Sequence, residues 1–216
     1  MQCSSGALLA AGLDGGHTII FIRKGDENVN QIPLTPPKPI PFGVSVFCFM
    51  MFLKGGAAMV VHPIDPVYNE HSRVLILGSF PSVKSREAEF FYGHPQNRFW
   101  KVLAAVFHRP VPASVEEKRA LLLEEGVALW DVIASCEIRG SSDSSIKNAV
   151  PNDLTPIFET AHIEAIYVNG KTAEKYYKKY LLPITRREAV CLPSTSPANA
   201  AWNLERLVEA WQILNP

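Results

Sequence analysis

After a long N-terminal segment, the chain alternates short apolar runs with amphipathic segments. Val74–Leu77 is a continuous apolar run that ends at Gly78, which is typical of a strand buried on both faces. Similar runs at residues 127–133, 163–168 and 189–192 predict three further strands. Because strands of this kind must be covered on both sides, the pattern indicates an α/β fold with a mostly parallel sheet.

Helical periodicity fills the segments between these runs. A helix is predicted from Phe99, and it should end before Pro110 because proline cannot continue a helix. Further helices are predicted at residues 115–125, 153–161 and 171–181, and near the C-terminus, where Leu204, Leu207, Val208, Trp211 and Leu214 share one face. The strands and helices alternate, so helices are expected on both faces of the sheet.

Ligands of such sheets bind at the carboxyl ends of the strands, here the loops after Leu77, Ile133, Val168 and Leu192. The sequence contains no GxGxxG after the first strand, no GxxxxGK[ST], no GxSxG and no HExxH, which excludes the common dinucleotide, P-loop, serine-hydrolase and zincin sites. What remains is a pocket lined by aromatic and amide side chains. Two loops rich in proline and serine border it, and their backbone N–H groups can face a phosphate.

The charge and cysteine content narrow the possible classes of protein. The 216 residues include 21 Lys+Arg and 21 Asp+Glu, so no net field attracts nucleic acid or a membrane, and any contact with a polyanion must be local. The four cysteines occur singly, without CxxC or a Cys/His spacing, which argues against a structural zinc or an iron–sulfur cluster. We therefore expect no metal and a reducing, cytoplasmic location.

Residues 1–58 differ from the rest of the chain. They hold seven of the 42 charged residues and a string of prolines between Pro33 and Pro41. Their apolar run, Phe42–Leu53, is shorter than the roughly 20 residues of a membrane helix. The segment is either a membrane or partner anchor or a poorly structured extension, and the absence of a helical or strand period favours the extension. We expect the domain to comprise residues 59–216 and the functional polypeptide to start near Met59.

Five segments, in order along the chain, resemble the hypoxanthine-DNA glycosylase (DNA-deoxyinosine glycosylase) branch of the uracil-DNA glycosylase superfamily. They are Val74–Ser82 (VLILGSFPS), Tyr92–Trp100 (YGHPQNRFW), Leu129–Val132 with Ser135 and Cys136 (LWDV and SC), Gly140–Ser145, and Leu192–Asn199 (LPSTSPAN). The resemblance covers about residues 62–216. It implies a three-layer α/β/α sandwich around a four-stranded, mostly parallel sheet. It also implies excision of a deaminated base from DNA without a cofactor.

The same resemblance assigns the catalytic role to Asn97. Members of the superfamily often carry Asp or Asn in the first-strand loop to handle the attacking water, whereas here Gly78–Ser82 has neither. An amide does not titrate, so Asn97 would orient the water through its carbonyl rather than act as a base. The alternative role for Asn97 is an N-cap of the helix predicted from Phe99.

Four residues are expected in the base pocket, of which the resemblance places Asp131: Ser79, Phe80, Tyr92 and Asp131. Asp131 would contact the edge of the flipped base, or it is an exposed strand-end carboxylate or a salt-bridge partner. Phe80 and Tyr92 would stack on the purine, or they pack in the core. Phe99 and Trp100 are assigned to the core. His94 is either a donor to a phosphate or to the leaving base, or a turn residue before Pro95.

The resemblance places DNA contacts at Ser194, Thr195, Ser196 and Asn199, and Lys171 is expected to contact DNA as well. Short hydroxyl and amide side chains can bind phosphates without net positive charge. Alternatively, the Pro/Ser loop is a turn that caps the last helix, with Asn199 as a cap. Lys171 begins a predicted helix, where anions bind readily. The serine loop 141–145 either borders the pocket or is a linker.

The sequence therefore predicts a monomeric enzyme whose partner is DNA containing a deaminated base, with no membrane contact. Three alternatives stay open: a uracil-excising enzyme of the same superfamily, a hydrolase of free nucleosides on the same scaffold, and a DNA-binding module without catalysis. The preference among hypoxanthine, uracil and xanthine depends on the detailed shape of the pocket.

Overall fold

The computed structural model describes residues 59–215, so the predictions for residues 1–58 lie outside the described part. Its central sheet has four strands in the order β3-β2-β6-β7, and all neighbouring strands are parallel. These strands are β2 (Val74–Gly78), β3 (Val127–Asp131), β6 (Ala165–Asn169) and β7 (Val190–Leu192). The predicted four-stranded parallel sheet is confirmed.

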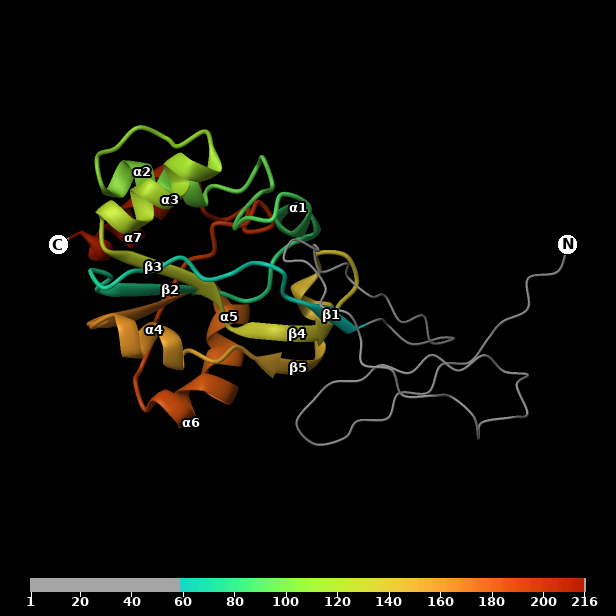
Figure 1. The fold of residues 1–216 in the computed structure, drawn as a ribbon. Coiled ribbons are helices and arrows are strands. Elements are labelled where there is room, and N and C mark those ends of the chain that lie inside the picture. The colour runs from blue at the N-terminus through green and yellow to red at the C-terminus, as the bar shows by residue number, and fades with distance from the viewer. Residues whose placement is uncertain (1–58, 216) are drawn as a thin grey trace, which may run out of the picture. The chain divides into compact units, whose positions relative to one another are not determined.

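Helices cover both faces of this sheet, as Figure 1 shows, with α2, α3 and α7 on one side and α4, α5 and α6 on the other. The α-helices are α1 (Val83–Glu87), α2 (Phe99–Val106), α3 (Val115–Glu124), α4 (Thr155–Thr160), α5 (Lys171–Tyr176), α6 (Leu182–Thr185) and α7 (Leu204–Trp211). Between α5 and α6 the chain forms a π-helical turn, Tyr177–Leu181. The three-layer α/β/α arrangement is therefore confirmed. Across residues 59–215, no helix is both long and apolar enough to span a membrane.

A second, antiparallel sheet packs beside the first, and the sequence analysis did not predict it. It contains β1 (Met59–Val61), β4 (Ile133–Glu137) and β5 (Lys147–Pro151), in the order β1-β4-β5. The apolar run 127–133, predicted as one strand, is split between the two sheets, so Ile133 begins β4 and does not end a central strand. The run stays buried through this change of sheet, and hydrophobicity alone therefore gives no sign of it.

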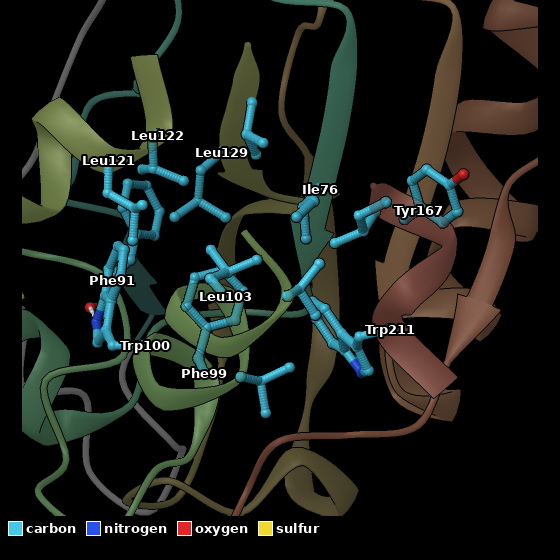
Figure 2. Packing of buried hydrophobic residues seen from close by; sticks show 14 of the residues in the cluster. Ile76, Phe91, Phe99, Trp100, Leu103, Leu121, Leu122, Leu129, Tyr167 and Trp211 are labelled. Carbon is cyan, nitrogen blue, oxygen red and sulfur yellow. Dashed lines mark hydrogen bonds between the residues drawn. The ribbon is translucent and has the colours of Figure 1, made fainter. Parts of the chain in front are cut away.

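The core lies in two layers, because successive residues of a strand point to opposite faces. Ile76 packs with α2, α3 and α7, whereas Leu75 and Leu77 pack with the opposite layer. Figure 2 shows the first of these layers, in which Phe99 and Trp211 are completely buried. Their rings meet edge to face with centroids 5.7 Å apart. The assignment of Phe99 and Trp100 to the core is confirmed.

Candidate active site

A cavity of about 310 Å³ opens at the carboxyl ends of the central strands, where the parallel sheet predicts a ligand site. Its lining includes Gly78–Ser82, Tyr92, His94, Asn97, Asp131, Ser141, Asp143, Asn169 and Ser194–Ala198. The four residues expected in the base pocket and the expected catalytic Asn97 thus surround one cavity. Of the expected DNA contacts, Ser194, Thr195 and Ser196 line it, whereas Lys171 and Asn199 lie outside its lining.

Asp131, the last residue of β3, is held by a histidine from beyond the end of β1. The Nε2 of His62 lies 2.8 Å from Oδ2 of Asp131, and both side chains are almost completely buried. The backbone N–H of Ile64 donates to Nδ1 of His62 over 3.1 Å, so the proton of the neutral ring is on Nε2, which donates to the carboxylate. The interpretation of Asp131 as an exposed strand-end carboxylate is therefore wrong.

Sequence reasoning missed His62. It stands 69 residues from its partner and belongs to no motif, so only the pairing of β1 with β4 brings the two together. The available signal was weak: a single histidine near the start of the segment that resembles the family.

Gly78 lies opposite Asp131 in the β2–β3 pairing, and the close approach of two side chains requires a glycine there. A Cβ at this position would lie 2.1 Å from Oδ1 of Asp131 and 3.0 Å from the hydroxyl oxygen of Tyr92. Both distances are shorter than a normal contact, so any larger residue would displace the two polar groups. The glycine therefore lets a carboxylate and a phenol converge on the cavity.

Tyr92 presents a buried hydroxyl that makes no hydrogen bond of normal distance and angle among residues 59–215, although the Asn169 side-chain amide is near enough to act on it. Its ring stacks on Phe99, with centroids 3.9 Å apart and planes 20° apart, and its φ of 52° is in the left-handed region. Burial, together with the negative charge of Asp131, raises the pKa of Tyr92, while the Asn169 amide acts in the opposite direction. The hydroxyl therefore stays protonated and can donate a hydrogen bond.

Phe80 both packs and lines the cavity, so its two interpretations are not exclusive. Its side chain is buried, its ring meets the His62 ring edge to face at 5.8 Å, and the Arg86 guanidinium lies 5.7 Å from its centroid. Its place in the cavity lining leaves its predicted stacking on a base as a prediction.

Asp143 adds a second carboxyl group to the cavity, and sequence reasoning did not single it out. It begins the short 3₁₀ helix Asp143–Ser145, and the hydroxyl of Ser79 donates to its Oδ2 over 3.0 Å. Burial raises the pKa of Asp143, the hydrogen bond from Ser79 opposes this, and the charge of Asp131 adds to the rise. The serine loop therefore borders the cavity and is not merely a linker; the sequence signal was an acidic residue inside the matching segment Gly140–Ser145.

Asn97 lines the cavity and also stabilises the turn that precedes α2. Its Oδ1 accepts the backbone N–H of Phe99, the first residue of α2, over 3.0 Å, whereas the N-cap of α2 is Arg98, whose side chain makes no capping hydrogen bond. A carbonyl oxygen has a second lone pair, so this contact leaves one free to orient water, and that role stays a prediction. Nearby, Nδ1 of His94 accepts the N–H of Gln96 over 3.2 Å, as a turn residue would.

The loop after β7, residues 193–202, is fixed from two sides. The side-chain amide of Asn169 accepts the N–H of Thr195 and donates to its hydroxyl, both over 3.0 Å. Arg98 donates to the backbone carbonyls of Thr195, Ser196, Asn199 and Trp202. Thr195, expected to contact DNA, is instead completely buried, and its side chain supports the loop from within.

The other expected DNA contacts differ in exposure and in partners. The hydroxyls of Ser194 and Ser196 accept N–H groups of their own loop, and the Asn199 amide donates to the carbonyl of Ser194 over 2.9 Å. The last helix is capped by Asn203, so the interpretation of Asn199 as its cap is wrong. Lys171 is highly exposed and pairs with Glu174 over 2.9 Å.

Comparisons with known proteins agree with this geometry. Residues 66–215 match the model of the uracil DNA glycosylase superfamily. A protein of Methanosarcina acetivorans named hypoxanthine DNA glycosylase is 32% identical over 158 residues, which are 72% of this chain and 98% of that protein. A protein of the same name from Methanosarcina barkeri is 30% identical over 136 residues, 62% of this chain and 85% of that protein.

The fold comparison gives the same result. The solution NMR structure of a candidate uracil DNA glycosylase from Methanosarcina acetivorans superposes with a TM-score of 0.60 at 29% identity, covering 71% of this chain and 97% of that one. The relatives carry the name of the branch that the sequence motifs resemble, so the prediction of the family is confirmed. The chain belongs to the uracil DNA glycosylase superfamily.

Proposed function

We propose that the protein is a monofunctional DNA glycosylase that hydrolyses the N-glycosidic bond of hypoxanthine in DNA. The observation that carries this proposal is the convergence of Tyr92, Asn97, Asp131 and the loop 193–202 on one cavity at the ends of the parallel strands. The names of the two Methanosarcina relatives support the choice of base. The enzyme acts as a cytoplasmic monomer and needs neither metal nor cofactor.

In this proposal the nucleotide leaves the duplex stack so that its base enters the cavity. As the glycosidic bond breaks, positive charge develops on the sugar and negative charge on the base. The Asn97 carbonyl orients the attacking water, and Asp131 contacts the edge of the base. Phe80 and Tyr92 border the purine, each with a hydrophobic ring.

The loop 193–202 is proposed to hold the DNA beside the flipped nucleotide. Ser194, Ser196 and Asn199 contribute hydroxyl, amide and backbone groups to phosphates, and exposed Lys171 adds a positive charge. The loop itself carries no charged side chain. Its role is therefore to position the DNA by shape and hydrogen bonds.

The test is incubation with duplexes that carry a single deoxyinosine, followed by alkali, which cleaves the strand at an abasic site. We expect strand breaks that depend on both enzyme and alkali, and none in the matched deoxyadenosine duplex. Breaks without alkali would contradict a monofunctional enzyme. Release from a deoxyuridine duplex alone would identify a uracil-excising enzyme, activity on free inosine alone a nucleoside hydrolase, and binding without abasic product a non-catalytic module.

A further inference from the structure

His62 is fixed at both of its ring nitrogens and on the faces of its ring. Nδ1 accepts from Ile64 and Nε2 donates to Asp131, while the rings of Phe80, Phe91 and Trp130 lie 5.8, 6.2 and 6.4 Å from its own. A proton on Nδ1 would point at the N–H of Ile64, so Nε2 is the nitrogen that donates to Asp131. The side chain offers one donor, and Asp131 receives it.

The hydrogen bond from His62 determines which oxygen of Asp131 is left to face the cavity. Its Oδ2 is occupied by His62, while its Oδ1 lies over Gly78, 2.1 Å from where a Cβ would be. The Tyr92 hydroxyl oxygen is 3.0 Å from the same point, so the two oxygens are separated by at most the sum of these distances. An acceptor and a donor that makes no hydrogen bond of normal geometry among the described residues therefore lie near each other, beside Gly78 in the cavity lining.

Deamination reverses the hydrogen-bonding edge of a base. Adenine and cytosine present an amino group beside a ring nitrogen with a lone pair, whereas hypoxanthine, xanthine and uracil present a carbonyl beside a ring N–H. A donor next to a carboxylate oxygen complements the second edge and repels the lone pair of the first. We propose that His62 is the positioning residue that presents Asp131 as an acceptor, so that the cavity selects bases with a carbonyl beside a ring N–H.

This inference rests on the proposed function and gives it a structural cause. The second carboxyl group supports it: burial raises the pKa of Asp143, so Asp143 binds a proton more readily than an exposed carboxyl does. Of the two carboxyl groups, Asp131 is the one that receives a hydrogen bond from His62. The tyrosine supplies the neighbouring donor, because its pKa is also raised.

The test compares single-turnover release from two duplexes: one with deoxyinosine and one with deoxynebularine, whose purine has a lone pair at N1 and no carbonyl. The wild type should prefer deoxyinosine by at least about tenfold, since a mispaired buried acceptor is penalised. H62A should lower this preference severalfold, and H62Q, which keeps an N–H donor, should recover much of it. H71Q, a change at an exposed histidine, is the matched control and should keep the wild-type preference.

A merely structural role of His62 predicts a lower melting temperature with an unchanged ratio between the two duplexes, and that result would overturn the proposal. If H62A does not fold, D131N provides the second test, because its amide can turn a donor toward the base; an unchanged ratio there would also overturn it. If the wild type releases no base, the proposed function fails. Calorimetric binding of free hypoxanthine against free adenine then decides: preference for hypoxanthine supports the edge selection, and equal binding refutes it.

Discussion

The two sides of the cavity use their polar groups in different ways. The floor, formed by Gly78, Tyr92, Asp131 and Asp143, holds two carboxyl groups and a hydroxyl that makes no hydrogen bond of normal geometry among residues 59–215. The rim, the loop 193–202, holds hydroxyl and amide groups that bind the backbone of the rim itself. A floor with unsatisfied or charged groups is suited to act on a ligand, whereas a self-satisfied rim is suited to keep a fixed shape.

This difference has an energetic side. An unpartnered buried hydroxyl costs about 1–3 kcal/mol, and buried carboxyl groups add a further desolvation penalty. The rim carries no such cost, because Asn169 and Arg98 satisfy its groups. The polar groups of the floor therefore lower the stability of the folded protein, as is usual where a protein retains polar groups for its function.

The largest expected effect is at Asn97, which lines the same cavity as floor and rim. Asn97→Ala should lower the maximal rate of excision by about 10²-fold to 10³-fold while DNA affinity stays nearly unchanged, because the lost group acts on the transition state. Single-turnover excision and a thermal melt on the same preparation measure both effects.

Asn203→Ala is the control for losing an asparagine that binds a backbone N–H at the start of a helix, because Asn203 caps α7 and lies outside the cavity lining. It should cost about 1 kcal/mol of stability without changing excision. If Asn97→Ala behaves like this control, Asn97 only stabilises the turn before α2 and the catalytic role is refuted.

The second effect, at Arg98, tests the rigidity of the rim. Arg98→Lys keeps the charge but cannot reach four carbonyls at once, so it should destabilise the protein by about 2 kcal/mol and weaken DNA binding about tenfold. Denaturant unfolding and DNA titration measure these effects. Arg206→Lys is the control, since Arg206 is exposed and donates to one carbonyl in the rim. Equal, small effects of both changes would show that the rim does not depend on its arginine.

Floor and rim also differ in how far the sequence alone predicts them. The parallel strands were recognisable because each is a short apolar run, and the cavity followed from their carboxyl ends. The rim was recognisable as LPSTSPAN, although the burial of Thr195 depends on Asn169, which is distant in sequence. Only part of the floor was recognisable from the sequence. His62 and Asp143 reach it through β1 and the serine loop, whose packing leaves no periodic pattern in the sequence.

A smaller effect is expected for the hydroxyls of the rim. Ser196→Ala should weaken DNA binding by a few-fold, corresponding to about 1 kcal/mol for one hydrogen bond, with little change in the maximal rate. Titration of a deoxyinosine duplex and single-turnover kinetics separate the two. Ser114→Ala, which removes the capping box of α3, should lower stability without affecting DNA affinity. A collapse of the maximal rate at constant affinity in Ser196→Ala would give the rim a chemical role.

The smallest effect is a difference in pH dependence between a carboxyl group of the floor and one on the surface. Burial raises the pKa of Asp143 above 3.8 in the folded protein, so its ionisation costs stability as the pH rises through that raised pKa. Asp143→Asn should therefore be more stable than the wild type at pH 7, and the advantage should vanish below pH 3.8.

Hydrogen bonds from Thr155 lower the pKa of exposed Asp153, so Asp153→Asn should be less stable than the wild type at pH 7 and equal to it in acid. Thermal melts of the three proteins from pH 3 to pH 7 measure the two differences. Curves of the same sign would show that Asp143 does not carry the cost of a buried charge and would remove the energetic contrast between floor and surface.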